Sequence, residues 1–315
     1  MDGGGGSRGS GGSRYRVPGG GGRDLGAKAK LEPQDLAPET PIRLDRVGFE
    51  GIARRVTIRG PQGSIALDLS VSVYVDLGPE RRGAHLSRNV EALIDAVNDV
   101  GESWSIEAYL DAIAKRLLEK HEYATQAIVK ARTIYHVDLE YAGIRGREPV
   151  SVEVRVSRDR AGAKKWAITV EARGMTVCPS SQETIASMKG LDPRTAPGHS
   201  QRVILRGTVE SRGTMVRIED IASALFSSFS APTFTLLKRI EEAKLVVEAF
   251  RNPKFLEDVV RDAALRLAEK FRGLVGDDSI IEVEAWSQES IHPHNLYSYK
   301  RGTVGDIIAE YKSKQ

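Results

Sequence analysis

The sequence contains one cysteine, Cys178, in a chain of 315 residues. A lone thiol cannot form an internal disulfide, so a fold held together by disulfide bonds is excluded. Three roles remain for Cys178: a small buried hydrophobic residue, a metal ligand or a nucleophile. The residues around it must decide between them.

Long apolar segments are missing as well. No stretch approaches the roughly 20 uncharged apolar residues that cross a bilayer, and the N-terminus lacks the apolar segment of a secretory signal. Neither sign of charge dominates, because 46 Lys and Arg residues are interleaved with 43 Asp and Glu residues. We therefore expect a cytoplasmic protein with no membrane partner and no specific nucleic-acid partner.

The composition that is present is globular, with 40% hydrophobic and 28% charged residues, and leaves room for about two domains. Gly and Ser dominate residues 1–26, which we interpret as a disordered tail. We interpret residues 31–43 as a proline-containing linker. The sequence thus predicts a tail and linker over 1–42, a first module over 43–160 and a second module over 161–315.

Hydrophobic periodicity predicts the elements of the first module. Alternation with a period of two predicts strands over 48–59, 64–76, 127–141 and 150–156, the last paired with a strand over 166–173. The spacing i, i+3, i+4, i+7 predicts a helix with its apolar face at Val90, Leu93, Ile94 and Val97. A second helix with the same spacing is expected over 106–118.

The second half shows a similar order of elements. We predict strands over 166–177, 202–209 and 280–286, helices over 218–229 and 254–271, and a further helical stretch bracketed by 236–242 and 252–261. The helix over 254–271 is the last one predicted, with its apolar face at Phe255, Val259, Ala263, Leu267 and Phe271. Helices placed between antiparallel strand pairs favour the α+β class, built here from two related modules.

Cys178 and His199 are the first candidate site residues. Cys178 ends a predicted strand and is followed by Pro179, while His199 directly precedes the next strand. If the two strands are neighbours, the thiol and the imidazole approach each other. Both side chains are preferred ligands of Zn²⁺ and Fe²⁺, so the pair favours a metal site.

A second group follows the strand over 280–286 and contains Glu289, His292 and His294. In an extended chain Glu289 and His292 would face opposite sides, so joint action requires a turn, for which Pro293 is suited. The alternative is an exposed polar loop.

Two further groups suggest ligand binding. His85 and Arg88 lie where a helix opens, with Ser87 as the expected N-cap, and such positions bind anions such as phosphate. Glu242 and Glu257 lie on helical segments, where a buried carboxylate can accept two hydrogen bonds from the N–H edge of guanine. The alternative for each of these residues is a solvated surface charge.

Taken together, these segments resemble the GTP cyclohydrolase type IB family, and within it the archaeal Fe(II)-dependent branch that starts methanopterin synthesis. The resemblance spans roughly residues 43–299. Its motifs are Gly83-Ala-His85-Leu-Ser-Arg88, similar to Gly-x-His-Met-Ser-Arg; Cys178-Pro-Ser, similar to Cys-Pro-Cys; His199-Ser-Gln-Arg202, similar to His-Asn-Gln-Arg; Leu-Leu-Lys238-Arg239 with Glu242; Asn252-Pro-Lys-Phe-Leu-Glu257; and Glu289-Ser-Ile-His292.

The resemblance implies tunnelling-fold modules, two per subunit, assembled into an oligomeric barrel (a dimer or tetramer) with active sites at subunit interfaces. It implies an Fe²⁺ cofactor, with Mn²⁺ or Zn²⁺ as alternatives. The metal-associated positions would be Cys178, His199, Glu242 and His292, and the catalytic positions Cys178, His199, Glu289 and His292. Glu257 would anchor the purine. We assign the triphosphate to His85, Arg88, Lys238 and Arg239.

The activity implied is the opening of the guanine ring of GTP, with release of formate and pyrophosphate and formation of 7,8-dihydroneopterin 2',3'-cyclic phosphate. Two departures from the family pattern stand out: Ser180 replaces the second cysteine, and the loop over 182–197 is longer. Three alternatives remain open: the triphosphate product, a nitrile reductase that uses Cys178 as a nucleophile, and a non-catalytic nucleotide or RNA binder.

Overall fold

The computed structural model describes residues 32–60, 63–100 and 105–314. The predicted tail over 1–26 therefore lies outside the described residues. Within them, one antiparallel sheet of nine strands extends through both halves of the chain, in the order β1-β2-β3-β4-β5-β6-β8-β9, with β7 paired to β5.

The strands are β1 (Leu44–Gly60), β2 (Gly63–Leu77), β3 (Gln126–Tyr141), β4 (Ile144–Asp159), β5 (Lys164–Val177), β6 (Ser200–Ser211), β7 (Ala231–Pro232), β8 (Ile280–Gln288) and β9 (Leu296–Thr303). The helices are η1 (Pro33–Asp35), α1 (Leu86–Val100), α2 (Ile106–Lys120), α3 (Pro179–Lys189), α4 (Ile218–Phe226), α5 (Arg239–Arg251), α6 (Leu256–Phe271) and α7 (Val304–Lys312). The α+β class with a large antiparallel sheet is confirmed.

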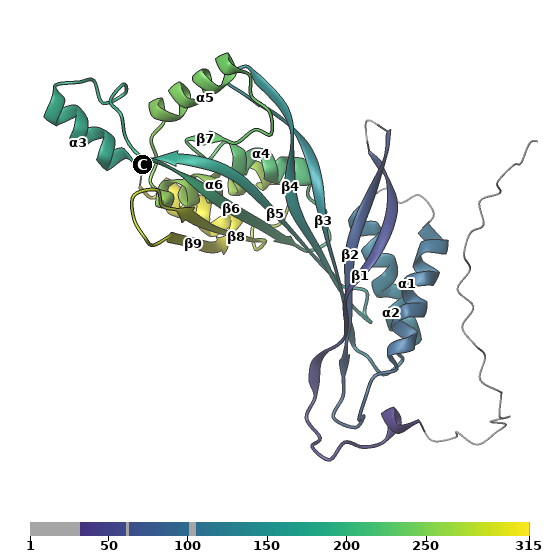
Figure 1. The fold of residues 1–315 in the computed structure, drawn as a ribbon. Helices are drawn as coiled ribbons and strands as arrows, with labels where there is room; N and C mark the ends of the chain where they lie inside the picture. Colours follow the sequence, from purple (N-terminus) through teal and green to yellow (C-terminus); the bar gives the residue numbers. More distant parts are fainter. Residues whose placement is uncertain (1–31, 61–62, 101–104, 315) are drawn as a thin grey trace, which may run out of the picture.

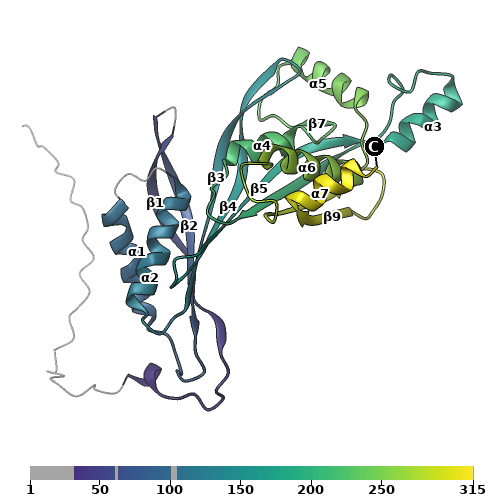
Figure 2. The same cartoon turned by 180° about the vertical axis from the view of Figure 1, so that it is seen from behind.

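Helices α2, α4 and α6 cover one face of the sheet, whereas α5 packs on β5 and β7 through a separate hydrophobic cluster. Helix α2 packs against β3 and β4, while α4 and α6 pack against β5, β6 and β8, and the two helix groups lie toward opposite ends of the strongly twisted sheet (Figures 1 and 2). The covered face supplies the main hydrophobic core. The other face carries cross-strand ion pairs, such as Arg206 with Glu171 and Glu284.

All predicted strands form, and most extend beyond the predicted limits. The alternation in β2 places Leu69, Val71 and Val73 in the core, as its period of two requires. The hairpin of β3 and β4 closes at Ala142 and Gly143, both of which have a positive φ, the backbone conformation that tight hairpin turns need.

The predicted apolar face of α1 was wrong in part. Leu93 is fully buried, but Val90 and Ile94 are 38% and 51% exposed, and the side chain of Val97 lies outside the described residues. The buried stripe instead contains Asn89, Ala92, Leu93 and Ala96. Helix α1 packs mainly on α2, and small alanine side chains allow two helices to approach closely.

Four local predictions need correction. Helix α1 begins at Leu86, so Ser87 lies inside the first turn and is not its N-cap. Phe255 precedes α6 and is 45% exposed, so it does not belong to the buried face of that helix. The predicted loop over 182–197 contains most of α3. The helix over 254–271 is not the last one, because β9 and α7 follow β8.

The predicted module boundary at residue 160 falls in the turn between β4 and β5, and the sheet continues across it. The β3–β4 hairpin also reaches the second half, where the Tyr141 hydroxyl donates to the backbone carbonyl of Ser230 at 2.9 Å. The division into two modules stays a prediction. None of the helices in the described residues is long and apolar enough to span a bilayer.

Candidate functional site

Cys178 and His199 lie side by side where β5 and β6 end. The two strands pair antiparallel up to Val177 and Ser200, and one residue further the Cys178 backbone N–H donates to the carbonyl of His199 at 3.0 Å. Residues directly opposite in an antiparallel pair project to the same face, with Cβ atoms on the order of 5 Å apart. The conditional prediction that these strands are neighbours is therefore confirmed.

The same face continues the hydrophobic core. In β5 the buried residues Ala172, Gly174 and Thr176 alternate toward Cys178, and in β6 Leu205 and Val203 alternate in the same way toward Gln201 and His199. Because side chains two residues apart share a face, the core merges at this edge into polar side chains. A reactive group placed here has a rigid base and access to solvent.

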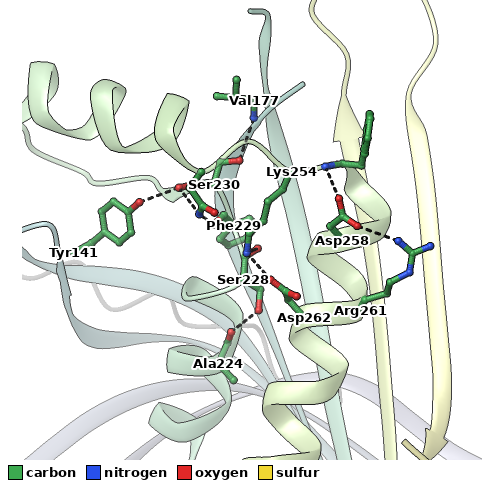
Figure 3. A network of polar contacts seen from close by, with 12 residues as sticks. Tyr141, Val177, Ala224, Ser228, Phe229, Ser230, Lys254, Asp258, Arg261 and Asp262 are labelled. Carbon is green, nitrogen blue, oxygen red and sulfur yellow. Dashed lines mark hydrogen bonds and ion pairs between the residues drawn. The ribbon is translucent and has the colours of Figure 1, made fainter. Parts of the chain in front are cut away.

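Four backbone hydrogen bonds fix the chain around Cys178. Val177 donates to the Ser230 hydroxyl at 3.2 Å and accepts from the Lys254 backbone N–H at 3.0 Å (Figure 3). The remaining two run from Cys178 to His199 and from Gln182 to Cys178. Cys178 is also the N-cap of α3, where its Sγ accepts from the Ser181 N–H at 3.5 Å.

Lys254 ties this region to helix α6. Its ammonium group donates to the Ser228 carbonyl at 3.1 Å and to Asp262 at 2.5 Å (Figure 3). The side chain of Lys254 is 12% exposed and that of Asp262 is 40% exposed, so solvent reaches this ion pair from the side of Asp262. The start of α6 is thereby held against the end of β5.

His199 is part of a short polar chain. Its Nδ1 lies 3.0 Å from Oε1 of Gln201, whose Nε2 donates to the hydroxyl of Thr176 at 2.8 Å. The imidazole of His292 approaches His199 edge-on, with 6.5 Å between ring centroids, and stacks on His294 at 5.2 Å. Three imidazoles from two segments of the chain therefore gather at this edge of the sheet.

The turn predicted around Pro293 forms between β8 and β9. Glu289, just beyond β8, accepts a hydrogen bond from the Ser287 hydroxyl at 2.5 Å. By the register of β6 with β8, in which Arg202 pairs with Gln288, Glu289 follows opposite Gln201. Glu289 and His292 thus reach the end of the sheet that carries Cys178 and His199.

The predicted residues on α5 and α6 are placed differently. Glu257 is exposed in the first turn of α6, one turn after Lys254. Glu242 is exposed on α5, eight residues before Phe250, whose carbonyl accepts from Gln182. Eight helical residues span about 12 Å, so one chain does not bring Glu242 to Cys178. Lys238 and Arg239 lie further still, exposed at the start of α5.

A separate polar cluster surrounds His85. Its Nδ1 lies 2.7 Å from Glu32 and its Nε2 lies 3.0 Å from Asp35, which also pairs with Arg81. The hydrogen bond from His85 lowers the pKa of Asp35, and the positive charges of His85 and Arg81 act in the same direction. Both carboxylates come from the segment interpreted as a linker, so sequence reasoning missed them.

Behind His85, the fully buried His121 contacts Asn89 at 2.5 Å and the Tyr123 hydroxyl at 2.9 Å. Burial lowers the pKa of His121 to about 4, and the charges of Arg88 and His85 lower it as well. Arg88 itself donates to the carbonyl of Lys120 at 3.2 Å. His85 and Arg88 belong to a packed polar cluster at the start of α1. Helix α1 lies at the opposite end of the molecule from α3, which Cys178 precedes (Figures 1 and 2).

One place among the described residues brings three candidate cation ligands together, because Glu32, Asp35 and His85 have ligand atoms within 4.8 Å of one another. At the other end, Cys178, His199 and His292 are of the residue types that Zn²⁺ and Fe²⁺ prefer. Their ligand atoms do not form such a close group within one chain. A cavity of about 930 Å³ on the helix-free face is lined by none of the predicted site residues.

Comparison with known proteins agrees with these features. A family model described as type I GTP cyclohydrolase folE2 matches residues 32–298. The chain is 51% identical over 278 residues to a GTP cyclohydrolase MptA of Aeropyrum pernix, covering 88% of this chain and 97% of that protein. It is 33% identical over 309 residues to a GTP cyclohydrolase MptA of Methanosphaera stadtmanae, covering 89% and 97%.

Among solved structures, the uricase of Arthrobacter globiformis superposes with a TM-score of 0.51 at 10% identity, covering 82% of this chain and 92% of that one. Identity this low shows the fold alone. The predicted tunnelling fold is confirmed, while the oligomeric barrel stays a prediction.

Proposed function

This chain belongs to the type I GTP cyclohydrolase family, and on that premise we propose that it opens the imidazole ring of guanine in GTP and releases formate. The observation that carries the proposal is the edge of the sheet where Cys178 and His199 are opposite each other. The ring of His292 approaches that of His199 edge-on at this edge. A thiol and imidazoles held on rigid strand ends suit a hydrolytic site with a bound divalent cation.

The reaction begins with addition of water to carbon 8 of guanine, a poor electrophile for neutral water. A bound Fe²⁺, with Mn²⁺ or Zn²⁺ as alternatives, supplies an acidified water molecule. We propose that Cys178, His199 and His292 would hold the cation. Glu242 would join them if helix α5 of a second copy of the chain supplies it. Glu289, oriented by Ser287, and His292 are placed to move protons as attack proceeds.

Recognition of GTP is assigned to charged residues around this edge. Glu257, exposed in the first turn of α6, accepts the N–H edge of guanine. Lys238 and Arg239 at the start of α5, together with His85 and Arg88, neutralise the triphosphate. Because His85 and Arg88 lie at the far end of the chain, they reach the site from a second copy. We therefore propose a homo-oligomer with sites between subunits.

After ring opening, hydrolysis of the formamide releases formate. The ribose carbons then rearrange and cyclise with the pyrimidine to form the pterin. The neighbouring side-chain hydroxyl then attacks the α-phosphorus and displaces pyrophosphate, which gives 7,8-dihydroneopterin 2',3'-cyclic phosphate, the product that we propose. Basic side chains near the triphosphate stabilise the leaving pyrophosphate.

Anaerobic incubation of the purified protein with GTP and Fe²⁺, followed by mass analysis of the pterin and an assay of formate, tests the proposal. We expect equimolar formate and a cyclic phosphate of dihydroneopterin. If the product is dihydroneopterin triphosphate, the proposed ring opening stands and the proposed loss of pyrophosphate is wrong. Absence of formate with Fe²⁺, Mn²⁺ and Zn²⁺ alike would overturn the proposal.

A matched pair of variants ties the activity to the proposed edge. Cys178→Ala removes the thiol, whereas Ser180→Ala alters the exposed position where the family pattern has a second cysteine. We expect the first variant to lose formate release and the second to keep it. Reduction of a nitrile substrate by NADPH, dependent on Cys178, would instead support the nucleophile alternative.

A further inference from the structure

Gln201 connects a buried hydroxyl to the imidazole of His199. Thr176 and Gln201 are directly opposite each other in the β5–β6 pair, and Cys178 and His199 follow one pair further on the same face. Thr176 is fully buried and accepts a hydrogen bond from Gln201 Nε2 at 2.8 Å. The carboxamide is therefore placed with its nitrogen end toward a buried hydroxyl.

Anchoring the nitrogen end decides what faces His199. A glutamine side chain has one donor end and one acceptor end. With Nε2 committed to Thr176, the acceptor Oε1 lies 3.0 Å from His199 Nδ1. An acceptor beside a ring nitrogen pairs with a proton on that nitrogen, so this orientation of the amide fits a neutral ring with N–H at Nδ1 and the lone pair on Nε2.

We propose that Gln201 is a positioning residue that holds His199 in the Nδ1–H tautomer and presents Nε2 to a divalent cation. The inference rests on the proposed function only in taking His199 as a ligand. It assigns a role to a residue that contacts neither cation nor substrate. Such outer contacts fix the tautomer and the ring orientation of a histidine ligand.

The side chain beside His199 Nδ1 is a neutral amide rather than a carboxylate. A carboxylate beside Nδ1 would accept the same proton, as carboxylates do beside histidine ligands of zinc. The amide accepts the Nδ1 proton without adding negative charge. Gln201→Glu should therefore keep the hydrogen bond but alter its charge, which makes it a conservative variant for rescue.

Zn²⁺ affinity of the metal-free protein, measured by competition with a chromophoric chelator, is the first readout. Gln201→Leu should weaken Zn²⁺ binding about 10- to 100-fold, the usual cost of losing such a contact. Gln201→Glu should recover most of this loss, and Thr176→Val, which removes only the anchor, should give a smaller loss. An unchanged affinity in Gln201→Leu would overturn the inference.

A glutamine elsewhere in the sheet gives the matched control. Gln126 donates to the Ser157 hydroxyl across β3 and β4, the same kind of cross-strand contact far from His199. Gln126→Leu should leave Zn²⁺ affinity unchanged. Melting temperatures of all variants show whether the fold persists, and Thr176→Val, nearly isosteric with the native residue, covers the case in which Gln201→Leu does not fold.

Nitrogen NMR of ¹⁵N-histidine-labelled apoprotein is the second readout, since it reports the tautomer directly. We expect His199 as the Nδ1–H form in the native protein and as a mixture in Gln201→Leu. A pure Nε2–H form in the native protein would mean that the amide is reversed and would refute the inference. If Zn²⁺ affinity depends on Gln201 but the native protein releases no formate from GTP, the proposed function fails while the inference stands.

Discussion

Two histidines at opposite ends of the sheet differ in what their neighbours leave free. His85 is 7% exposed, and a carboxylate lies within hydrogen-bonding distance of each of its ring nitrogens. His199 is half-buried and contacts one neutral amide through Nδ1. A ring whose two nitrogens both contact carboxylates must exchange one of these contacts before it binds a phosphate, whereas a ring with one nitrogen uncommitted is ready for ligand binding or proton transfer.

The surroundings of the two histidines differ in the same sense. The segment with Glu32 and Asp35 folds over His85, and His121 lies buried behind it. Around His199, the strand ends are fixed by backbone hydrogen bonds, while the nearby His292 remains exposed. The first cluster therefore contributes to folding, and the second combines a rigid base with access for a substrate.

The largest expected effect is the loss of activity in Cys178→Ala and His199→Ala. Because loss of an outer contact to a metal ligand costs 10- to 100-fold, loss of a ligand should lower formate release from GTP by at least about 100-fold. Melting temperatures should stay close to the native value, since neither side chain belongs to the hydrophobic core. Full activity of either variant in Fe²⁺-supplemented assays would mean that the end of the sheet with Cys178 and His199 is not the catalytic one.

Glu257→Gln tests whether Glu257 recognises guanine beside the cluster around His199. Hydrogen bonds to a charged group contribute roughly 1.5–3 kcal/mol, so KM for GTP should rise about 10- to 100-fold, with kcat changed less. Asp258→Asn, on the next position of α6, is a suitable control because Asp258 pairs with Arg261 at the surface. An unchanged KM in Glu257→Gln would contradict the anchoring role.

Acid should weaken the first cluster selectively. The pKa of His121 is lowered from 6.5 to about 4 in the folded protein, so the unfolded chain binds more protons between these values. Stability should therefore fall by about 2–3 kcal/mol as pH drops from above 6.5 to 4. Chemical unfolding at several pH values measures this slope.

The matching variant is His121→Gln, which can keep a polar contact with Asn89 but cannot be protonated. It should unfold with a shallower pH dependence than the native protein over the same range. An identical slope in both proteins would assign the acid sensitivity to groups elsewhere.

The smallest expected effect is that of Glu32→Gln. Glu32 is 59% exposed, and its ion pair with His85 is open to solvent on that side, so its loss should cost less than about 1 kcal/mol. Thermal melting with and without a chelator sharpens the comparison. A drop in melting temperature caused by the chelator in the native protein, but absent in Glu32→Gln, would show that this cluster also binds a cation.

Much of the secondary structure could be predicted from the sequence because hydrophobic periodicity is local. The alternation in β2 and the spacing over 256–271 record which residues are buried, and both elements form as predicted. Prediction was poorer for β9, none of whose residues is buried, and for α3, which lies in a segment of mixed polarity that gives no helical stripe. Where little is buried, periodicity carries little information.

The candidate site was only partly accessible to sequence reasoning. The residue types and their positions at strand ends pointed to Cys178 and His199, and short motifs added Glu289 and His292. The sequence held no sign that Gln201 would connect Thr176 to His199, because that contact depends on the register of two strands. Glu32 and Asp35 were missed for a similar reason, since they meet His85 across about 50 residues.

The sequence by itself determined most of the strands and helices and the antiparallel α+β class, because these follow from local hydrophobic pattern. Tertiary structure alone decided which face of α1 is buried, which nitrogen of His199 is occupied, and that the His85 and Cys178 groups lie at opposite ends of one sheet. These features depend on contacts between segments distant in the chain, and no local pattern encodes such contacts.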